Sequence, residues 1–394
     1  MKINFKYNNL NLMIKIFFLL IIFILILFNF YNYSKYLSKK ELRKRKKDIY
    51  KFEKYYKLCN KGILINKKHF QQINNPKISI ITPIYNKGKY IQRYLRSIQN
   101  QVFNDIEIIL IDDYSTDNST TIIEKFQKED ERIILIKHKK NKGTLISRNE
   151  GVLKSKGEYL IFIDPDDLIS KDILKLCYNM AKKYDYDLIR FNLYEGNENI
   201  NLEHIIKNLT NKPIYQPELS LYLFYGLGKL EEIDYYITNK LIKKIKFIET
   251  LNLIDKFYLN QFMIDCEDGL INSILYKLSN SYYLIKELGY FYNKNTQSIT
   301  NENESNFLKR LKSNFLYIKF IFQYTKNNII EKNIANYIFS EIYSVHKDEI
   351  IDIFKEINDT KFYIEVMDLY INSDYIPIET KNIILNILKL LIKK

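Results

Sequence analysis

The stretch Tyr159–Asp167 reads Tyr-Leu-Ile-Phe-Ile-Asp-Pro-Asp-Asp, and it decides the fold. Its first five residues are aromatic or aliphatic, which predicts a short buried strand at 159–163. Three carboxylates then follow within four positions, and they are stable at an apolar strand end mainly when a cation lies among them. Mg²⁺ and Mn²⁺ prefer oxygen ligands and keep other positions for water and substrate phosphates. The stretch predicts a metal site for a diphosphate-bearing substrate; the alternative is an acidic turn before a helix expected from Lys171.

Strand and helix patterns alternate around this stretch. Four further strands are expected from apolar runs, at 77–82, 106–111, 133–136 and 187–193. Helices are expected between them, at 90–98, from about 120 and after 143. This alternation predicts an α/β fold with a mostly parallel sheet, in which ligands bind at the carboxyl ends of the strands. The loops that begin at Pro83, Asp112 and Asp164 are all expected at that edge.

Three residue types in these loops suit a nucleotide diphosphate. Tyr85 offers an aromatic face to a base, Asp113 offers a carboxylate to a base or ribose, and Arg148 offers a planar cation to phosphate. Each has an ordinary structural alternative: a core tyrosine, a turn carboxylate and a solvated helix arginine. Their expected convergence on one edge of the sheet favours a nucleotide site.

Five motifs in the chain, taken in order, resemble those of glycosyltransferase family 2. They are ISIITPIYN at 78–86, IDDYSTD at 111–117, GTLISRN at 143–149, GEYLIFIDPDD at 157–167 and CEDGLIN at 266–272. The resemblance covers about residues 77–300. It implies the GT-A fold, a Rossmann-like α/β fold with a mostly parallel sheet flanked by helices.

The resemblance also implies a nucleotide-sugar-binding set, in which Tyr85 packs on the nucleobase and Asp113 accepts a hydrogen bond from it. The full set is Pro83, Tyr85, Asp112, Asp113, Arg148 and Asp164. Asp164-Pro165-Asp166 resembles the D-x-D motif of the family, with Asp164 toward the ribose and Asp166 on a Mn²⁺ or Mg²⁺ cofactor. Pro165 replaces the small residue common at the middle position, and we expect it to stiffen the loop.

Glu267 and Asp268 resemble the acidic pair that supplies the catalytic base in inverting members, and we expect Asp268 to be the base. The implied reaction moves a sugar from a nucleotide-diphosphate donor, with a UDP-sugar the first choice, to a hydroxyl of a glycan, lipid-linked or protein acceptor. One alternative for the pair is an ordinary acidic helix N-terminus. An alternative for the chain is a non-catalytic nucleotide-sugar or glycan-binding relative, against which the joint presence of Asp166 and the acidic pair argues.

An apolar run at 16–28, extended by its flanks to 12–33, reaches the roughly 20 residues that cross a bilayer. No small-x-small cleavage site follows, which favours an uncleaved membrane anchor over a signal peptide. Lys39–Lys47 is strongly basic, so the positive-inside rule predicts a cytoplasmic catalytic domain, with a lumenal Golgi location as the alternative.

The net charge of +15 permits nucleic acid, an anionic membrane or phosphate-bearing substrates as partners. The densest basic cluster lies beside the expected anchor, where lipid is a simpler partner than nucleic acid, so we expect no nucleic-acid partner. Three widely spaced cysteines suggest neither zinc nor a disulfide framework. The expected domains are an anchor at 12–33, a basic stalk at 34–76, a catalytic domain at 77–300 and a helical C-terminal region at 301–394.

Overall fold

The computed structural model describes residues 70–196, 204–205, 213–215, 236–263 and 266–293, and the single residues 47, 50, 54, 313, 316, 317, 319 and 320. The chain divides into two compact units, Met1–Lys57 and Leu58–Lys394, and the fold below belongs to the second. The expected anchor, and most of the expected stalk and C-terminal region, lie outside the described residues. Within the described part, no helix combines the length and the apolar character needed to cross a membrane.

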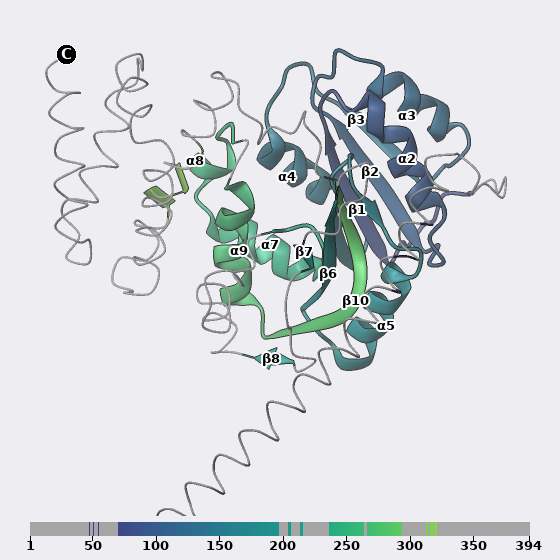
Figure 1. Ribbon diagram of the computed structural model, residues 1–394. Helices are drawn as coiled ribbons and strands as arrows, with labels where there is room; N and C mark the ends of the chain where they lie inside the picture. The colour runs from purple at the N-terminus through teal and green to yellow at the C-terminus, as the bar shows by residue number, and fades with distance from the viewer. Residues whose placement is uncertain are drawn as a thin grey trace, which may run out of the picture. The chain divides into compact units, whose positions relative to one another are not determined.

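The first half of the sheet consists of four parallel strands in the spatial order β3-β2-β1-β4. The first three of these are labelled in Figure 1. Their bounds are Ile78–Ile84 for β1, Ile106–Asp112 for β2, Ile133–Lys137 for β3 and Tyr159–Phe162 for β4. The strand patterns in the sequence therefore matched these strands to within two residues. The register places Ile78 of β1 beside Ile106 on one side and Tyr159 on the other, so the loops after β1, β2 and β4 leave from one edge.

The second half of the sheet is mixed: its long strands continue the expected parallel arrangement, and short antiparallel strands that the sequence patterns did not reveal lie beside them. It continues in the order β9-β6-β10-β5, with bounds Lys240–Lys243, Leu188–Gly196, Ser281–Asn293 and Leu168–Ile169. β6 and β10 are parallel, whereas β9 is antiparallel to both β4 and β6, and β5 is antiparallel to β10. Two short strands, β7 (His204–Ile205) and β8 (Ile214–Tyr215), pair with β6 and β10. The physical reason is that antiparallel neighbours need no helical crossover, so the strand–helix alternation cannot reveal them.

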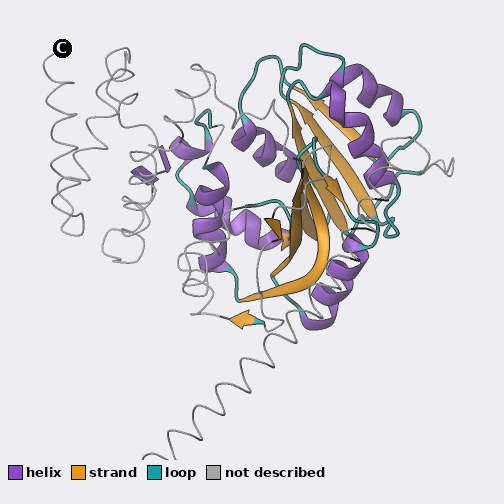
Figure 2. Ribbon diagram, in the orientation of Figure 1, coloured by secondary structure: helices purple, strands orange, loops and turns teal. Residues whose placement is uncertain are grey.

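Helices cover both faces of the sheet (Figures 1 and 2). On one face lie α2 (Gly88–Gln99), α3 (Ser119–Gln127) and α5 (Ile173–Tyr184). On the other lie α4 (Thr144–Lys154), α7 (Lys244–Leu253) and α9 (Glu267–Leu278), with the single turn α8 (Lys256–Leu259) between the last two. Gly151 of α4 approaches Ile81 and Ile111 closely enough that a Cβ there would collide with them, and the rings of Phe162 and Phe247 lie 5.1 Å apart.

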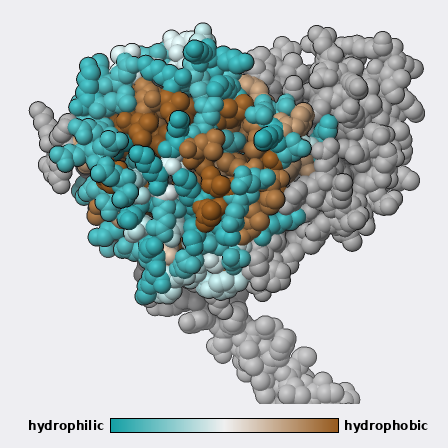
Figure 3. Space-filling view, turned by 180° about the vertical axis from the view of Figure 1, so that it is seen from behind, coloured by the Kyte–Doolittle hydropathy of each residue, from teal (hydrophilic) through white to brown (hydrophobic). Residues whose placement is uncertain are grey.

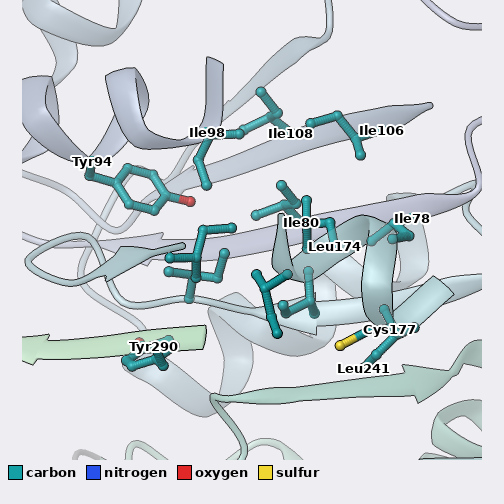
Figure 4. Packing of buried hydrophobic residues seen from close by; sticks show 14 of the residues in the cluster. Ile78, Ile80, Tyr94, Ile98, Ile106, Ile108, Leu174, Cys177, Leu241 and Tyr290 are labelled. Atoms are coloured by element: carbon teal, nitrogen blue, oxygen red, sulfur yellow. The ribbon is translucent and has the colours of Figure 1, made fainter. Parts of the chain in front are cut away.

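The side chains of β1 show how the two faces share the core. Ile78 and Ile80 point toward α2 and α5, while Ile81 points toward α4, and all three are fully buried. Figure 4 shows the first of these faces, where β1, β2, α2 and α5 contribute to one cluster. Parallel strands that are buried on both faces appear in the sequence as continuous apolar runs, which explains why β1, β2 and β4 were easy to predict.

The described surface is largely hydrophilic, with hydrophobic residues gathered in patches on the face shown in Figure 3. Large exposed hydrophobic side chains include Leu153, Ile245 and Leu253. Isolated apolar residues on a surface are ordinary, so these carry no functional argument by themselves.

Candidate functional site

A cavity of about 200 Å³ opens at the edge where β1, β2 and β4 end. This is the edge at which parallel sheets bind ligands. Seven of the nine site residues predicted from the sequence line it: Pro83, Tyr85, Asp113, Arg148, Asp164, Asp166 and Glu267. The other two, Asp112 and Asp268, do not line it. Lys87, Asp167 and Tyr292 also line it and were not among the predicted site residues.

Arg148 connects the D-x-D loop to the acidic pair. Its Nη1 donates to Glu267 Oε1 at 3.1 Å and to Asp268 Oδ1, and its Nη2 donates to Asp164 Oδ1 at 3.2 Å. The Arg148 side chain is only 6% exposed. Burial opposes its charge, but the three carboxylates outweigh burial and raise the pKa of the guanidinium. Arg148 therefore acts in this geometry as a shared cation for three acidic side chains from two distant motifs.

Asp113, just after β2, is buried and organises the loop that begins α4. Its Oδ1 accepts from the backbone N of Lys142 at 2.7 Å and lies 2.7 Å from His138 Nδ1. Its Oδ2 accepts from the backbone N of Gly143 at 2.8 Å. Gly143 has φ +90°, which favours glycine, and it directly precedes α4. By holding this turn, Asp113 helps to place Arg148 one turn further along the helix.

Asp112 contributes to a neighbouring loop instead. One carboxylate oxygen accepts from the backbone N of Ser115 at 2.9 Å, and the other accepts from the Thr120 hydroxyl. These contacts tie the end of β2 to the first turn of α3, because Thr120 lies in that helix. The structure therefore places Asp112 in the support of the loop rather than at the cavity.

Tyr85 presents its ring at the cavity and is 44% exposed. Its neighbour Asn86 fixes this loop: the Asn86 backbone N donates to Ser115 Oγ at 3.0 Å, and Asn86 Oδ1 accepts from the backbone N of Thr116 at 2.8 Å. The loops after β1 and β2 are thus joined. The arrangement leaves an aromatic face accessible for stacking on a fixed backbone.

Two residues of β10 hold the D-x-D loop in place by hydrogen bonds. The Tyr290 hydroxyl donates to Asp167 Oδ2 at 2.7 Å and accepts from the backbone N of Asp164 at 3.2 Å. The backbone N of Asn293 donates to Asp167 Oδ1 at 2.8 Å. Burial raises the pKa of the Asp167 carboxyl well above its ordinary value, and the charges of Asp166 and Asp164 add to this. Burial also raises the pKa of Asp164, against the influence of Arg148.

Asp166 lines the cavity and pairs with Lys87. Lys87 Nζ is 2.5 Å from Asp166 Oδ2, and the two side chains are 18% and 14% exposed. Arg93 of α2 donates to the Asp166 carbonyl oxygen at 2.9 Å, so α2 and the residue before it hold both the backbone and the side chain. Sequence reasoning missed Lys87 because lysine is abundant throughout the chain.

The side chains at the cavity show whether a divalent metal ion fits there. Within the described residues, no group of three or more His, Cys, Asp or Glu side chains is arranged to hold a metal ion. Asp166 is nevertheless a cavity-lining carboxylate that already has a cation against one oxygen. Such a carboxylate fits an ion that takes one protein ligand and completes its shell with substrate phosphates and water.

The acidic pair occupies the first turn of α9, where the helix dipole favours negative charge. Cys266, directly before it, has a left-handed backbone with φ 59°. Glu267 lines the cavity. Asp268 receives Arg148 on Oδ1 and the backbone N of Ile237 on Oδ2 at 2.9 Å. The structure thus brings both carboxylates to Arg148 and places Glu267 nearer the cavity than Asp268.

Part of the chain is similar in sequence to curated glycosyltransferases. The chain is 38% identical over 122 residues to the glycosyltransferase GlyG of Streptococcus pneumoniae, an alignment that covers 31% of this chain and 40% of the relative. It is 31% identical over 219 residues to GlyA of the same organism, covering 54% of this chain and 30% of the relative. The chain therefore spans less than half the length of these curated relatives.

Among solved structures, TarS 1–349 of S. aureus in complex with UDP-GlcNAc matches with a TM-score of 0.57 and 17% identity. The match covers 80% of this chain and 88% of that one, and it supports the GT-A type of fold. Residues 79–249 match the family model described as glycosyl transferase family 2, a span that includes four of the five motifs in whole or nearly so. Over residues 79–249 the chain therefore carries a glycosyl transferase family 2 domain.

Proposed function

We propose that this chain is an inverting glycosyltransferase that uses a nucleotide-diphosphate sugar, with UDP-sugars as the first candidates, and an acceptor hydroxyl. The observation that carries the proposal is the meeting of motifs more than a hundred residues apart, through Arg148, at one cavity. The solved relative TarS is described in complexes with UDP and with UDP-GlcNAc, which supports a UDP-sugar.

In this proposal, the loops after β1 and β2 bind the nucleoside. The half-exposed ring of Tyr85 stacks on the base, and Pro83 packs beside it. Asp113 holds the turn before α4 and offers a carboxylate edge to the base. Asp164 lies on the ribose side of the D-x-D loop. A Mn²⁺ or Mg²⁺ ion held by Asp166 would neutralise charge on the leaving diphosphate.

The acidic pair carries the proton transfer. Asp268 accepts the proton of the acceptor hydroxyl as that oxygen attacks the anomeric carbon and the bond to the diphosphate breaks on the opposite side. Arg148 orients Asp268 and Glu267 by direct hydrogen bonds. Glu267 lies nearer the cavity, so it is the competing candidate for the base and is tested beside Asp268.

We also propose that residues 12–33 anchor the protein in a membrane, with the catalytic domain on the cytoplasmic side. The support is the apolar run and the basic flank in the sequence. Extraction of membranes with alkaline carbonate tests the anchor, because an integral protein stays in the pellet. Protease treatment of sealed vesicles tests the side, because a cytoplasmic domain is digested only where that side is accessible.

The decisive experiment uses the full-length chain in detergent and screens nucleotide-sugars for Mn²⁺-dependent release of nucleoside diphosphate. Asp166→Ala, Asp268→Asn and Glu267→Gln are compared with Asp185→Asn, a control on a carboxylate that is 84% exposed and does not line the cavity. Loss of a catalytic base lowers the rate about 10²- to 10⁴-fold. Turnover that needs metal, Asp166 and Asp268 supports the proposal. Metal-dependent binding without turnover with any acceptor favours the non-catalytic binding relative, and neither turnover nor binding contradicts both.

A further inference from the structure

Lys87 occupies a position that no predicted role explains. It follows β1 and directly precedes the first residue of α2, and its backbone N donates to Ser119 Oγ at 2.8 Å. The backbone is therefore fixed, while the side chain crosses the cavity edge to reach Asp166 on the D-x-D loop. The contact joins residues 79 positions apart in the sequence.

The charges around the cavity show why this contact matters. The described lining contains five carboxylates, those of Asp113, Asp164, Asp166, Asp167 and Glu267, against the two cations Lys87 and Arg148. Arg148 contacts Asp164, Glu267 and Asp268. Lys87 brings a positive charge to Asp166, with Nζ 2.5 Å from Oδ2.

The Lys87 ammonium lies directly at the carboxylate that the metal ion would use. Its Nζ donates to Asp166 Oδ2 at 2.5 Å, and the two side chains are mostly buried. A metal ion that reaches this carboxylate therefore meets a cation already in contact with it.

A divalent ion bound to Asp166 would compete directly with Lys87. Such ions lie about 2 Å from a carboxylate oxygen, and Lys87 Nζ is already 2.5 Å from Oδ2. Two cations cannot share that oxygen without strong repulsion. The ammonium must move when the ion arrives, and leaving it buried without an acceptor costs free energy. A diphosphate that binds with the ion supplies new acceptor oxygens in the same cavity.

We propose that Lys87 couples metal binding to donor binding by exchanging partners. Without a donor, its ammonium neutralises Asp166 and weakens the binding of metal alone. When a nucleoside diphosphate enters with the ion, Lys87 transfers to a non-bridging phosphate oxygen, and Asp166 is released to the metal. The transfer of Lys87 to a phosphate oxygen rests on the proposed function. The competition between Lys87 and a metal ion at Asp166 rests only on the observed contact between the two side chains.

The test measures Mn²⁺ binding to the full-length chain in detergent by the electron paramagnetic resonance signal of free Mn²⁺, with and without saturating UDP. Lys87→Met removes the ammonium, and Lys89→Met removes an exposed lysine two residues away as the matched control. For Lys87→Met we expect about tenfold tighter binding of Mn²⁺ alone and about a tenfold smaller effect of UDP on that affinity, a typical size for coupling between two ligands. Lys89→Met should match the wild type.

Two results would overturn the inference. One is an unchanged affinity for Mn²⁺ alone in Lys87→Met, and the other is an unchanged effect of UDP on that affinity. Lys87→Gln is a second variant where the methionine variant fails to fold, and Asp166→Ala should abolish the tight site in every background. A wild type that binds no UDP, GDP or other nucleoside diphosphate would count against the proposed function, while the arm with Mn²⁺ alone would still decide the competition at Asp166.

Discussion

Replacing Arg148 by methionine is the perturbation that tests the site most directly. Methionine keeps an apolar stem of similar length but removes the charge shared by Asp164, Glu267 and Asp268. Removal of one partner from a buried ion pair costs about 3–5 kcal/mol. Asp164 is 32% exposed and Asp268 is 21% exposed, so water offsets part of this. We therefore expect the free energy of unfolding to fall by about 3 kcal/mol at pH 7.5.

The pH dependence of this loss separates charge from packing. Burial already raises the pKa of Asp164 above its unfolded value, and loss of the guanidinium raises it further. A carboxyl with a raised folded-state pKa stabilises the fold below its unfolded pKa, near 4, and that contribution is lost as pH rises through the folded value. The cost of Arg148→Met should therefore be largest at pH 7.5 and should shrink by about 1 kcal/mol or more at pH 5.

The assay is urea unfolding of the full-length chain at the two pH values, with Arg96→Met as the control. Arg96 on α2 pairs with the exposed Glu129, so its loss should cost less than about 1 kcal/mol at both pH values. An equal cost for Arg148→Met at pH 5 and pH 7.5 would show that packing rather than charge explains the loss. A cost no larger than that of Arg96→Met would refute the reasoning altogether.

Three further changes test the support of the site, each by urea unfolding. Tyr290→Phe removes the hydroxyl that bonds the D-x-D loop and should cost about 1–3 kcal/mol; Tyr159→Phe, whose buried hydroxyl finds no hydrogen-bond partner among the described residues, should cost nothing. The free energy of unfolding of Asp167→Asn, taken relative to the wild type, should increase as the pH is raised from 5 to 8. Burial raises the pKa of Asp167, so its ionisation destabilises the wild-type fold as the pH rises, and asparagine cannot ionise. A difference that does not change with pH would contradict this. Cys266→Gly should be neutral within about 1 kcal/mol, whereas Cys266→Val should lose more than that, because φ is 59° there; equal effects would argue against a left-handed turn before Glu267.

The first half of the fold was predictable because its strands are buried on both faces. β1, β2 and β4 therefore appear as unbroken apolar runs that end in polar loops. β9 escaped prediction because a lysine occupies each end of its four residues, and Lys240 is fully buried despite its charge. β10 is hard to recognise in the sequence because its apolar pattern is interrupted by Lys286, Glu287 and Gly289, where the pairing with β6 shifts register.

Site residues that belong to a sequence motif could be predicted. Site residues that matter only through a contact with a distant part of the chain could not. The support that Tyr290 gives the D-x-D loop spans more than 120 residues of sequence and depends on the pairing of β10. His138, whose Nδ1 lies 2.7 Å from Asp113 Oδ1, stands in the loop before α4, and no sequence motif marks it. Lys87 reaches Asp166 because β1 and β4 are neighbours in the sheet, which brings the loops after them together. This contact cannot be inferred from the sequence.

The two cations of the cavity differ in how freely each can change partners. Arg148 is shared by three carboxylates, so its movement would leave several buried charges uncompensated, and it acts as a fixed part of the scaffold. Lys87 contacts Asp166 through a long side chain, and a phosphate oxygen can accept a hydrogen bond from the same ammonium. Substitution of Arg148 should therefore appear mainly in the free energy of unfolding, and substitution of Lys87 mainly in the linkage between metal and nucleotide. The contact between Lys87 and Asp166 can then change when the nucleotide-sugar binds, while Arg148 keeps the acidic pair in place.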